Sequence, residues 1–127
     1  MKITVFTSNN SRHNYYINLL ANYCDELFVV QECITKFPGK LNGHYSKSKI
    51  VEKYFSLVEK AQKKIFTNDY IKFNKKCKIN YLPMQMGDLS YYSLSSLKEF
   101  LKSNLYLVFG SSYIKGDLIN FLVKKKQ

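Results

Sequence analysis

The stretch from Leu105 to Leu122, LYLVFGSSYIKGDLINFL, limits the possible folds of this chain more than any other. Its first five residues, 105–109, are apolar without alternation, which is typical of a strand buried on both faces in a parallel sheet covered by helices. Gly110 ends this run, and a short helix is expected to begin at Gly116. Ligands of open α/β sheets bind beyond the carboxyl ends of the strands. Residues 110–115 therefore form either an ordinary turn or the rim of a binding site.

The start of the chain predicts a strand, a helix and a second strand. Residues 3–7 (ITVFT) and 27–31 (LFVVQ) form the expected strands, and residues 12–23 form the helix between them. Two strands joined by one helix in so short a stretch run parallel, with a right-handed crossover. At helical spacing, the face of this helix toward the sheet is expected to carry Tyr15, Tyr16, Leu19, Leu20 and Tyr23.

Two further helices and one further strand are expected in the rest of the chain. The helices cover residues 47–66 and 93–102, and the strand covers residues 77–82 and ends at Pro83. The apolar stripe of the first helix is expected at Ile50, Tyr54, Leu57, Val58, Ala61 and Ile65, and the inward side of the second at Leu94, Leu97 and Leu101. The order βαβαβαβα predicts one α/β domain over residues 1–127, a Rossmann-like three-layer fold. Its mostly parallel sheet has about four strands in the order 3-2-1-4 and helices on both faces.

The net charge of +11 comes from nineteen lysines and a single arginine, Arg12. A basic chain can bind nucleic acid, but recognition of bases and phosphates relies on the bidentate arginine side chain. We therefore favour a solvated lysine surface. The alternative, a nucleic-acid site, would use Lys72, Lys75, Lys76 and Lys78, and its binding would weaken steeply with salt.

The cysteines and histidines do not show the spacing of a metal site. Cys24, Cys33 and Cys77 are far apart, as are His13 and His44, and an odd number of cysteines suits thiols in a reducing compartment. The apolar runs are too short to cross a bilayer, and Met1 leads directly into a strand. We expect a cytoplasmic protein without bound metal and without a membrane partner.

The turn after the first strand lacks the glycine patterns of dinucleotide-binding and P-loop proteins. It carries Asn10, Ser11 and Arg12 at the start of a helix. Free amide groups and the helix dipole favour an anion there, which Arg12 would bind. Alternatively, Asn10 and Ser11 only cap the helix and Arg12 is solvated.

Other polar residues favour structural roles. His13 lacks a partner carboxylate in the sequence and is expected to be structural rather than a general base. Ser111 and Ser112 do not form the nucleophile elbow of hydrolases, and no Asp–His pair follows them. Asp88 and Asp117 are expected to be a turn residue and a helix-start residue. The residues thus predict no catalytic group.

Three segments together resemble the formyltransferase family, whose members use 10-formyltetrahydrofolate. They are residues 11–20 (SRHNYYINLL) with 27–30 (LFVV), the helical stretch that begins YFSLVEKA at Tyr54 and continues to Phe66, and residues 104–114 (NLYLVFGSSYI). They lie within residues 11–114, and their order and spacing carry the resemblance. The resemblance implies transfer of a formyl group to an amine, such as an amino sugar nucleotide or methionyl-tRNA.

The resemblance also implies two binding segments. Ser112, Tyr113, Ile114 and Lys115 match the family's loop that lines the folate pterin pocket, and backbone groups leaving a strand end can bind a pterin edge. Asn10, Ser11 and Arg12 match the region that holds the acceptor, and a phosphorylated amine would suit an anion site there.

The sequence departs from the family at its catalytic motif. The family has an Asn-x-His pattern and a later Asp on the next strand, and no Asn-x-His occurs after Leu118. We therefore expect a truncated or incomplete enzyme that is inactive alone. Without that next strand, residues 105–109 form an open edge, and we expect a second copy or another chain to cover it. The alternative is a non-enzymatic ligand-binding or interaction module of the same fold.

Overall fold

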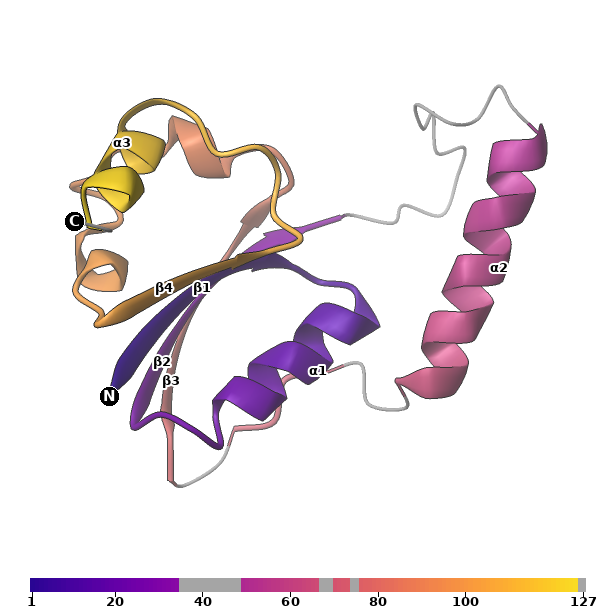
Figure 1. Ribbon diagram of the computed structural model, residues 1–127, viewed down its shortest axis with the longest axis horizontal. Coiled ribbons are helices and arrows are strands. Elements are labelled where there is room, and N and C mark those ends of the chain that lie inside the picture. Colours follow the sequence, from indigo (N-terminus) through magenta and orange to yellow (C-terminus); the bar gives the residue numbers. More distant parts are fainter. Residues whose placement is uncertain (35–48, 67–69, 74–75, 126–127) are drawn as a thin grey trace.

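The computed structural model describes residues 1–34, 49–66, 70–73 and 76–125. Its centre is a parallel sheet of four strands in the order β3-β2-β1-β4 (Figure 1). The strands are β1 (Lys2–Ser8), β2 (Glu26–Cys33), β3 (Lys78–Gln85) and β4 (Leu105–Phe109). This arrangement confirms the predicted Rossmann-like α/β fold and its strand order.

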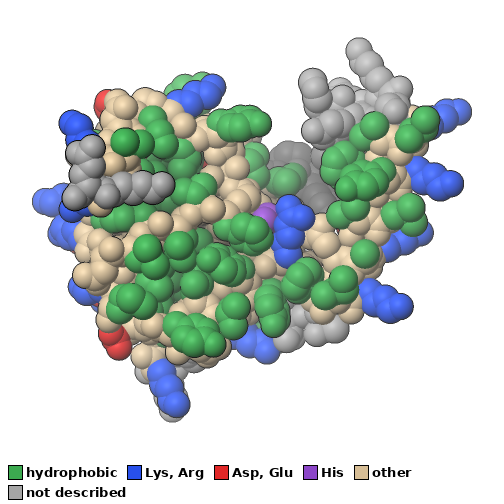
Figure 2. All heavy atoms as spheres, viewed as in Figure 1, with side chains coloured by type: hydrophobic (Ala, Val, Ile, Leu, Met, Phe, Trp, Pro, Cys, Tyr) green, Lys and Arg blue, Asp and Glu red, His purple; other side chains and the backbone are tan. Residues whose placement is uncertain are grey.

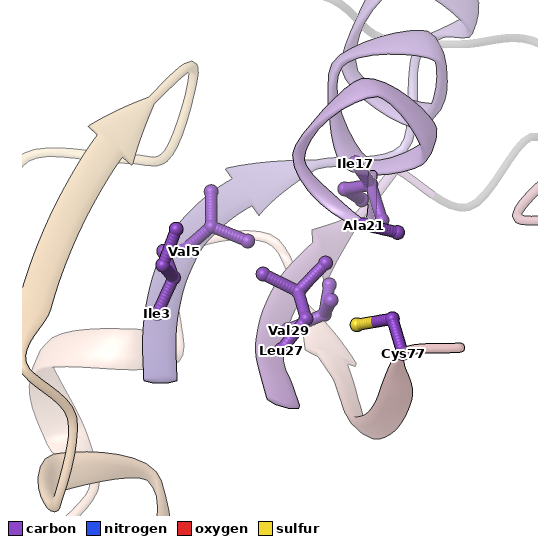
Figure 3. Close-up of a cluster of buried hydrophobic side chains, with 7 residues drawn as sticks. All are labelled: Ile3, Val5, Ile17, Ala21, Leu27, Val29 and Cys77. Atoms are coloured by element: carbon purple, nitrogen blue, oxygen red, sulfur yellow. The ribbon is translucent and has the colours of Figure 1, made fainter. Parts of the chain in front are cut away.

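Helices cover both faces of the sheet, as predicted (Figure 1). α1 (Ser11–Leu20) lies on one face, where Ile17 and Ala21 pack on side chains of β1 and β2 (Figure 3). α3 (Gly116–Lys124) and two 3-10 turns, η1 (Leu89–Tyr91) and η2 (Lys98–Leu101), lie on the other. The buried core on that face consists of Phe6, Val30, Met84, Leu89, Leu97, Leu101 and Leu118.

The predicted sheet-facing side of α1 was partly wrong. Tyr15, Leu19 and Tyr23 are 49%, 40% and 70% exposed, whereas Tyr16 and Leu20 pack beside the core. The residues that α1 buries are His13, Asn14 and Ile17. Periodicity of apolar residues misses this face because its first turn is polar.

α2 (Lys49–Ile65) lies to the side of the sheet (Figure 1). None of its residues is buried, and Ile50, Tyr54, Leu57 and Ile65 of the predicted apolar stripe are 57–83% exposed. Near its end, the rings of Phe66 and Tyr15 lie 5.3 Å apart. The helix itself is confirmed, but its stripe does not enter the core. Residues 47 and 48, at the predicted start, lie outside the described residues.

The helix predicted over residues 93–102 was wrong. The hydroxyl of Ser93 lies 2.9 and 2.8 Å from those of Ser95 and Ser96, and it accepts the Ser96 backbone N–H at 3.1 Å. Serine hydroxyls that bond locally compete with the helical backbone ladder, and only the single turn η2 forms. Leu97 and Leu101 still point inward, as predicted.

Two strand predictions also need correction. β3 does not end at Pro83 but continues through it to Gln85, and an edge strand tolerates proline because one side needs no ladder bonds. β4 is not buried on both faces, since Leu105, Val108 and Phe109 are 42%, 55% and 39% exposed. β4 is the edge strand opposite β3, so its apolar run lies at an edge of the sheet.

Among the described residues, no helix is both long enough and apolar enough to span a membrane.

Candidate functional site

The segments that follow β1, β3 and β4 meet at the carboxyl edge of the sheet (Figure 1). Glu32, near the end of β2, lies between two of them and is fully buried. One of its carboxylate oxygens accepts the backbone N–H of Gly87 at 2.6 Å and, more weakly, that of Leu89 at 3.5 Å. That oxygen also accepts the Ser112 hydroxyl at 2.8 Å, and the other accepts the Ser112 backbone N–H at 2.7 Å. Glu32 therefore ties the loop after β4 to the loop after β3.

His13, in the first turn of α1, is buried between the ends of β1 and β4. Its Nε2 accepts the Nε–H of Arg12 at 3.2 Å, and its Nδ1 lies 2.6 Å from the Ser8 hydroxyl oxygen. Because arginine is always a donor, Nε2 is unprotonated, and the neutral ring carries its proton on Nδ1 and donates it to Ser8. His13 is thus not a base for Ser8, and its two bonds connect Ser8 to Arg12.

The protonation of His13 is set by its surroundings. Burial, and secondarily the positive charge of Arg12, lowers the pKa of His13 from 6.5 to about 4. The neutral ring can therefore accept the Arg12 N–H at physiological pH. This bond holds the guanidinium by its Nε–H and leaves its terminal nitrogens as donors. Arg12 itself is exposed.

Gly110 brings the segment after β4 against His13. A Cβ atom at residue 110 would lie 2.2 Å from Nε2 of His13, and the φ angle of Gly110 is +76°, in the region that favours glycine. The ring of Phe109 also meets the His13 ring edge-on, with centroids 5.0 Å apart. The close approach joins the two segments for which the sequence predicts ligand contacts.

A second buried polar group lies beneath the β1–α1 turn. The Gln31 side-chain N–H donates to the Ser8 carbonyl oxygen at 2.9 Å and to the Asn14 side-chain oxygen at 2.7 Å. The Tyr81 hydroxyl donates to the Gln31 side-chain oxygen. Burial, together with nearby Cys33, raises the pKa of Tyr81 to about 12, so it stays a neutral donor. These bonds fix the turn from below.

The predicted acceptor residues lie at the start of α1. Asn10 is the N-cap, and its carbonyl oxygen accepts the N–H groups of His13 and Asn14 at 2.9 and 3.1 Å, but its side chain makes no capping bond. Ser11 is the first helical residue, and only Arg12 of the three is exposed. Side-chain capping by Asn10 therefore does not explain this turn.

The predicted folate loop, Ser112 to Lys115, is fixed at both ends. Glu32 holds Ser112, while the Ser90 hydroxyl donates to the Tyr113 carbonyl oxygen at 3.2 Å and accepts the Lys115 N–H at 2.9 Å. The Tyr113 side chain is 91% exposed, and Ile114 packs beside the core under α3. The loop is therefore a fixed backbone that presents one aromatic ring to solvent.

A cavity of about 580 Å³ lies beside this loop, along the free edge of β4. Most of its wall is apolar and comes from β4, the loop and α3, including Leu105, Val108, Ile114, Ile119 and Val123. On the face shown in Figure 2, hydrophobic side chains gather over β4 and extend toward α1. The cavity and the fixed loop share Ser112, Tyr113 and Ile114.

The structure describes only part of the other polar residues that the sequence singles out. Among the described residues, no group of three or more His, Cys, Asp or Glu side chains could hold a metal ion, and His44 lies outside that part of the chain. Of the four lysines named for nucleic acid, Lys75 also lies outside it. Lys72 and Lys76 are exposed, while Lys78 pairs with Glu26 at 3.6 Å.

Sequence reasoning missed Glu32, Gln31 and Ser8. The partners of Glu32 lie 55 and 80 residues away in the sequence. One signal was available: a carboxylate that directly follows the apolar run LFVV and Gln31 is expected at the carboxyl edge of the sheet, where polar residues meet.

No protein-family model, curated protein or solved structure matches the chain.

Proposed function

We propose that this domain is the ligand-binding part of a formyltransferase-like enzyme, in which residues 112–115 contact a reduced-folate carrier, 10-formyltetrahydrofolate. The proposal is supported by the sequence resemblance together with one observation, the fixed loop after β4. Glu32 accepts both the N–H and the hydroxyl of Ser112, so the loop has a preset conformation. Preorganised groups bind ligands with a smaller entropy loss than mobile ones.

The residues beside the loop suit the flat faces of a ring such as a pterin. The cavity volume of about 580 Å³ lies within the range of small-molecule sites. Ile114 supplies an apolar wall and Tyr113 an aromatic one, while the backbone N–H groups of Ser112 and Lys115 are bonded to Glu32 and Ser90 and hold the loop in shape. The carrier, when bound, supplies the formyl group.

Arg12 would hold the anionic part of the amine acceptor. His13 fixes the Nε end of its guanidinium, and the terminal nitrogens can bind a phosphate in the bidentate manner typical of arginine. The acceptor class is therefore a phosphorylated amine, such as an amino sugar nucleotide. With the carrier bound, these residues would hold the amine beside the formyl group that the carrier would supply.

A second candidate function is a non-enzymatic interaction module. It is favoured by the exposed apolar edge of β4, where Leu105 and Val108 are 42% and 55% exposed. The unpaired backbone groups of an exposed strand edge can hydrogen-bond to another strand. A second copy or another chain would therefore cover the edge of β4. A strictly monomeric protein at high concentration, with β4 solvated, would contradict such coverage.

The proposed function is tested by calorimetric binding of 10-formyltetrahydrofolate and, separately, of inorganic pyrophosphate as an anion probe. Tyr113→Ala should weaken folate binding by about tenfold, the equivalent of about 1.4 kcal/mol for a lost aromatic contact, and leave pyrophosphate binding unchanged. Arg12→Ala should do the reverse. Tyr23→Ala, which removes a 70% exposed ring in the turn after α1, is the matched control.

Two results would contradict the proposal. One is the absence of folate binding by the wild-type domain. The other is an equal loss of both ligands in both variants while Tyr23→Ala binds normally, because the two segments would then not hold separate ligands.

A further inference from the structure

Cys24 and Cys77 lie together at the amino-terminal end of the sheet, away from the candidate site. Their sulfur atoms are 3.7 Å apart, and both carry thiols. Cys24 precedes β2 and Cys77 precedes β3, and the parallel register pairs Glu26 with Lys78. The Lys78 N–H also donates to the Asp25 carbonyl oxygen at 2.9 Å. The two backbones are thus neighbours, and Cys77 lies one register position from Cys24. A strand spacing of about 4.8 Å and a rise of about 3.3 Å per residue place such residues at a Cα separation compatible with a disulfide, about 4.4–6.8 Å.

The two thiols differ in access. Cys77 is 3% exposed and belongs to the core cluster beneath α1 (Figure 3). Cys24 is partly exposed and lines a largely polar groove of about 410 Å³, together with Asn22, Tyr23 and Asp25. A small reagent can therefore reach Cys24 first, with Cys77 behind it.

We propose that Cys24 and Cys77 form a dithiol modification site that reacts with low-molecular-weight disulfides of the glutathione class. The Cys24 thiolate attacks one sulfur of the reagent, forms a mixed disulfide and releases one thiol. The Cys77 thiolate then attacks the Cys24 sulfur, forms the Cys24–Cys77 bond and releases the second thiol. Two protein thiols are oxidised, one reagent disulfide is reduced, and the two protons leave with the released thiols.

The surroundings of the pair set its rate and its effect. Burial, and then the hydrogen bond to Cys77, raises the pKa of Cys24 to about 12. The thiolate is therefore scarce, and the reaction should be slow at neutral pH and accelerate about tenfold per pH unit. The bond would link the α1–β2 connection to the start of β3, and closing this long loop restricts the unfolded chain. The oxidised protein should unfold at a higher urea concentration.

To test this, the reduced full chain is treated with glutathione disulfide at pH 8. The reaction is then quenched with acid, and the remaining thiols are labelled with a maleimide. The expected result is an intact mass lower by two hydrogen atoms, label only on Cys33, and a higher urea midpoint that dithiothreitol reverses. Cys77→Ser should stop at a mixed disulfide between Cys24 and glutathione. Cys33→Ser is the matched control and should oxidise like the wild type.

The proposal would be overturned if wild-type Cys24 kept glutathione while Cys77 remained open to the label. A bond from Cys33 to either other cysteine, or no change in mass at any pH at which the protein is folded, would overturn it as well. Peptide mapping of the wild type decides these outcomes even if Cys77→Ser fails to fold. None of them depends on folate or pyrophosphate binding.

Discussion

Replacing Glu32 by glutamine should destabilise the protein far more than its small chemical change suggests. The carboxylate is fully buried and accepts three short bonds, from Gly87 N–H, Ser112 N–H and the Ser112 hydroxyl, at 2.6–2.8 Å. A glutamine keeps the volume, but its NH₂ group must face at least one of these donors. One bond to a charged group is lost and one buried N–H is left without an acceptor, which together cost about 2–4 kcal/mol.

The assay is urea unfolding followed by far-UV circular dichroism. For a small domain, the expected loss lowers the unfolding midpoint by about 1–2 M. Amide hydrogen exchange should also become faster at Gly87 and Ser112, because the bonds to Glu32 protect their N–H groups.

Glu59→Gln is the matched control for this substitution. Glu59 pairs with Lys63 at 3.2 Å on α2, with half of its side chain exposed, and such surface pairs contribute at most about 1 kcal/mol. Equal midpoints for Glu32→Gln and Glu59→Gln would refute the reasoning, since the buried carboxylate would then not hold the two loops together.

Two further predictions concern the contact between His13 and the end of β4. Gly110→Ala should lower the free energy of unfolding by about 2–4 kcal/mol, since its Cβ would lie 2.2 Å from the His13 ring. In the same denaturation assay, Gly87→Ala should cost only about 1 kcal/mol, because the site has a positive φ but open space. The pKa of His13 falls from 6.5 to about 4 on folding, so the unfolded chain binds more protons between these values. The free energy of unfolding should therefore fall by up to about 3 kcal/mol as the pH falls from 6.5 to 4. His13→Asn should flatten this part of the plot of unfolding free energy against pH. An unchanged plot for this variant would show that His13 is not the titrating group.

The sheet could be predicted from sequence because its signals are local. Unbroken apolar runs such as 105–109 are typical of parallel strands, and one helix between two strands fixes their direction. The order β3-β2-β1-β4 then follows from a preference shared by doubly wound folds. These inferences need no knowledge of which side chains meet.

The polar contacts at the carboxyl edge could not be predicted in this way. Glu32 meets Gly87 and Ser112 only after β3 and β4 have taken their places in the sheet. His13 and Asn14 occupy the buried face of α1 because Ser8 and Gln31 offer them hydrogen bonds, so a search for apolar spacing selected tyrosines that lie outside. In each case a buried polar group is stable only with its hydrogen-bond partner. That partner is either remote in the sequence or a polar residue that a pattern of apolar residues does not reveal.

The same contacts indicate what the carboxyl edge can contribute to a reaction. A general base needs an available lone pair within reach of the substrate, but both oxygens of Glu32 accept bonds from the loops, and both nitrogens of His13 are engaged by Ser8 and Arg12. These groups hold backbone segments in place and orient Arg12. If the proposed formyl transfer occurs at this edge, proton transfer therefore depends on groups other than Glu32 and His13. The domain's own contribution would be to position the carrier and the acceptor.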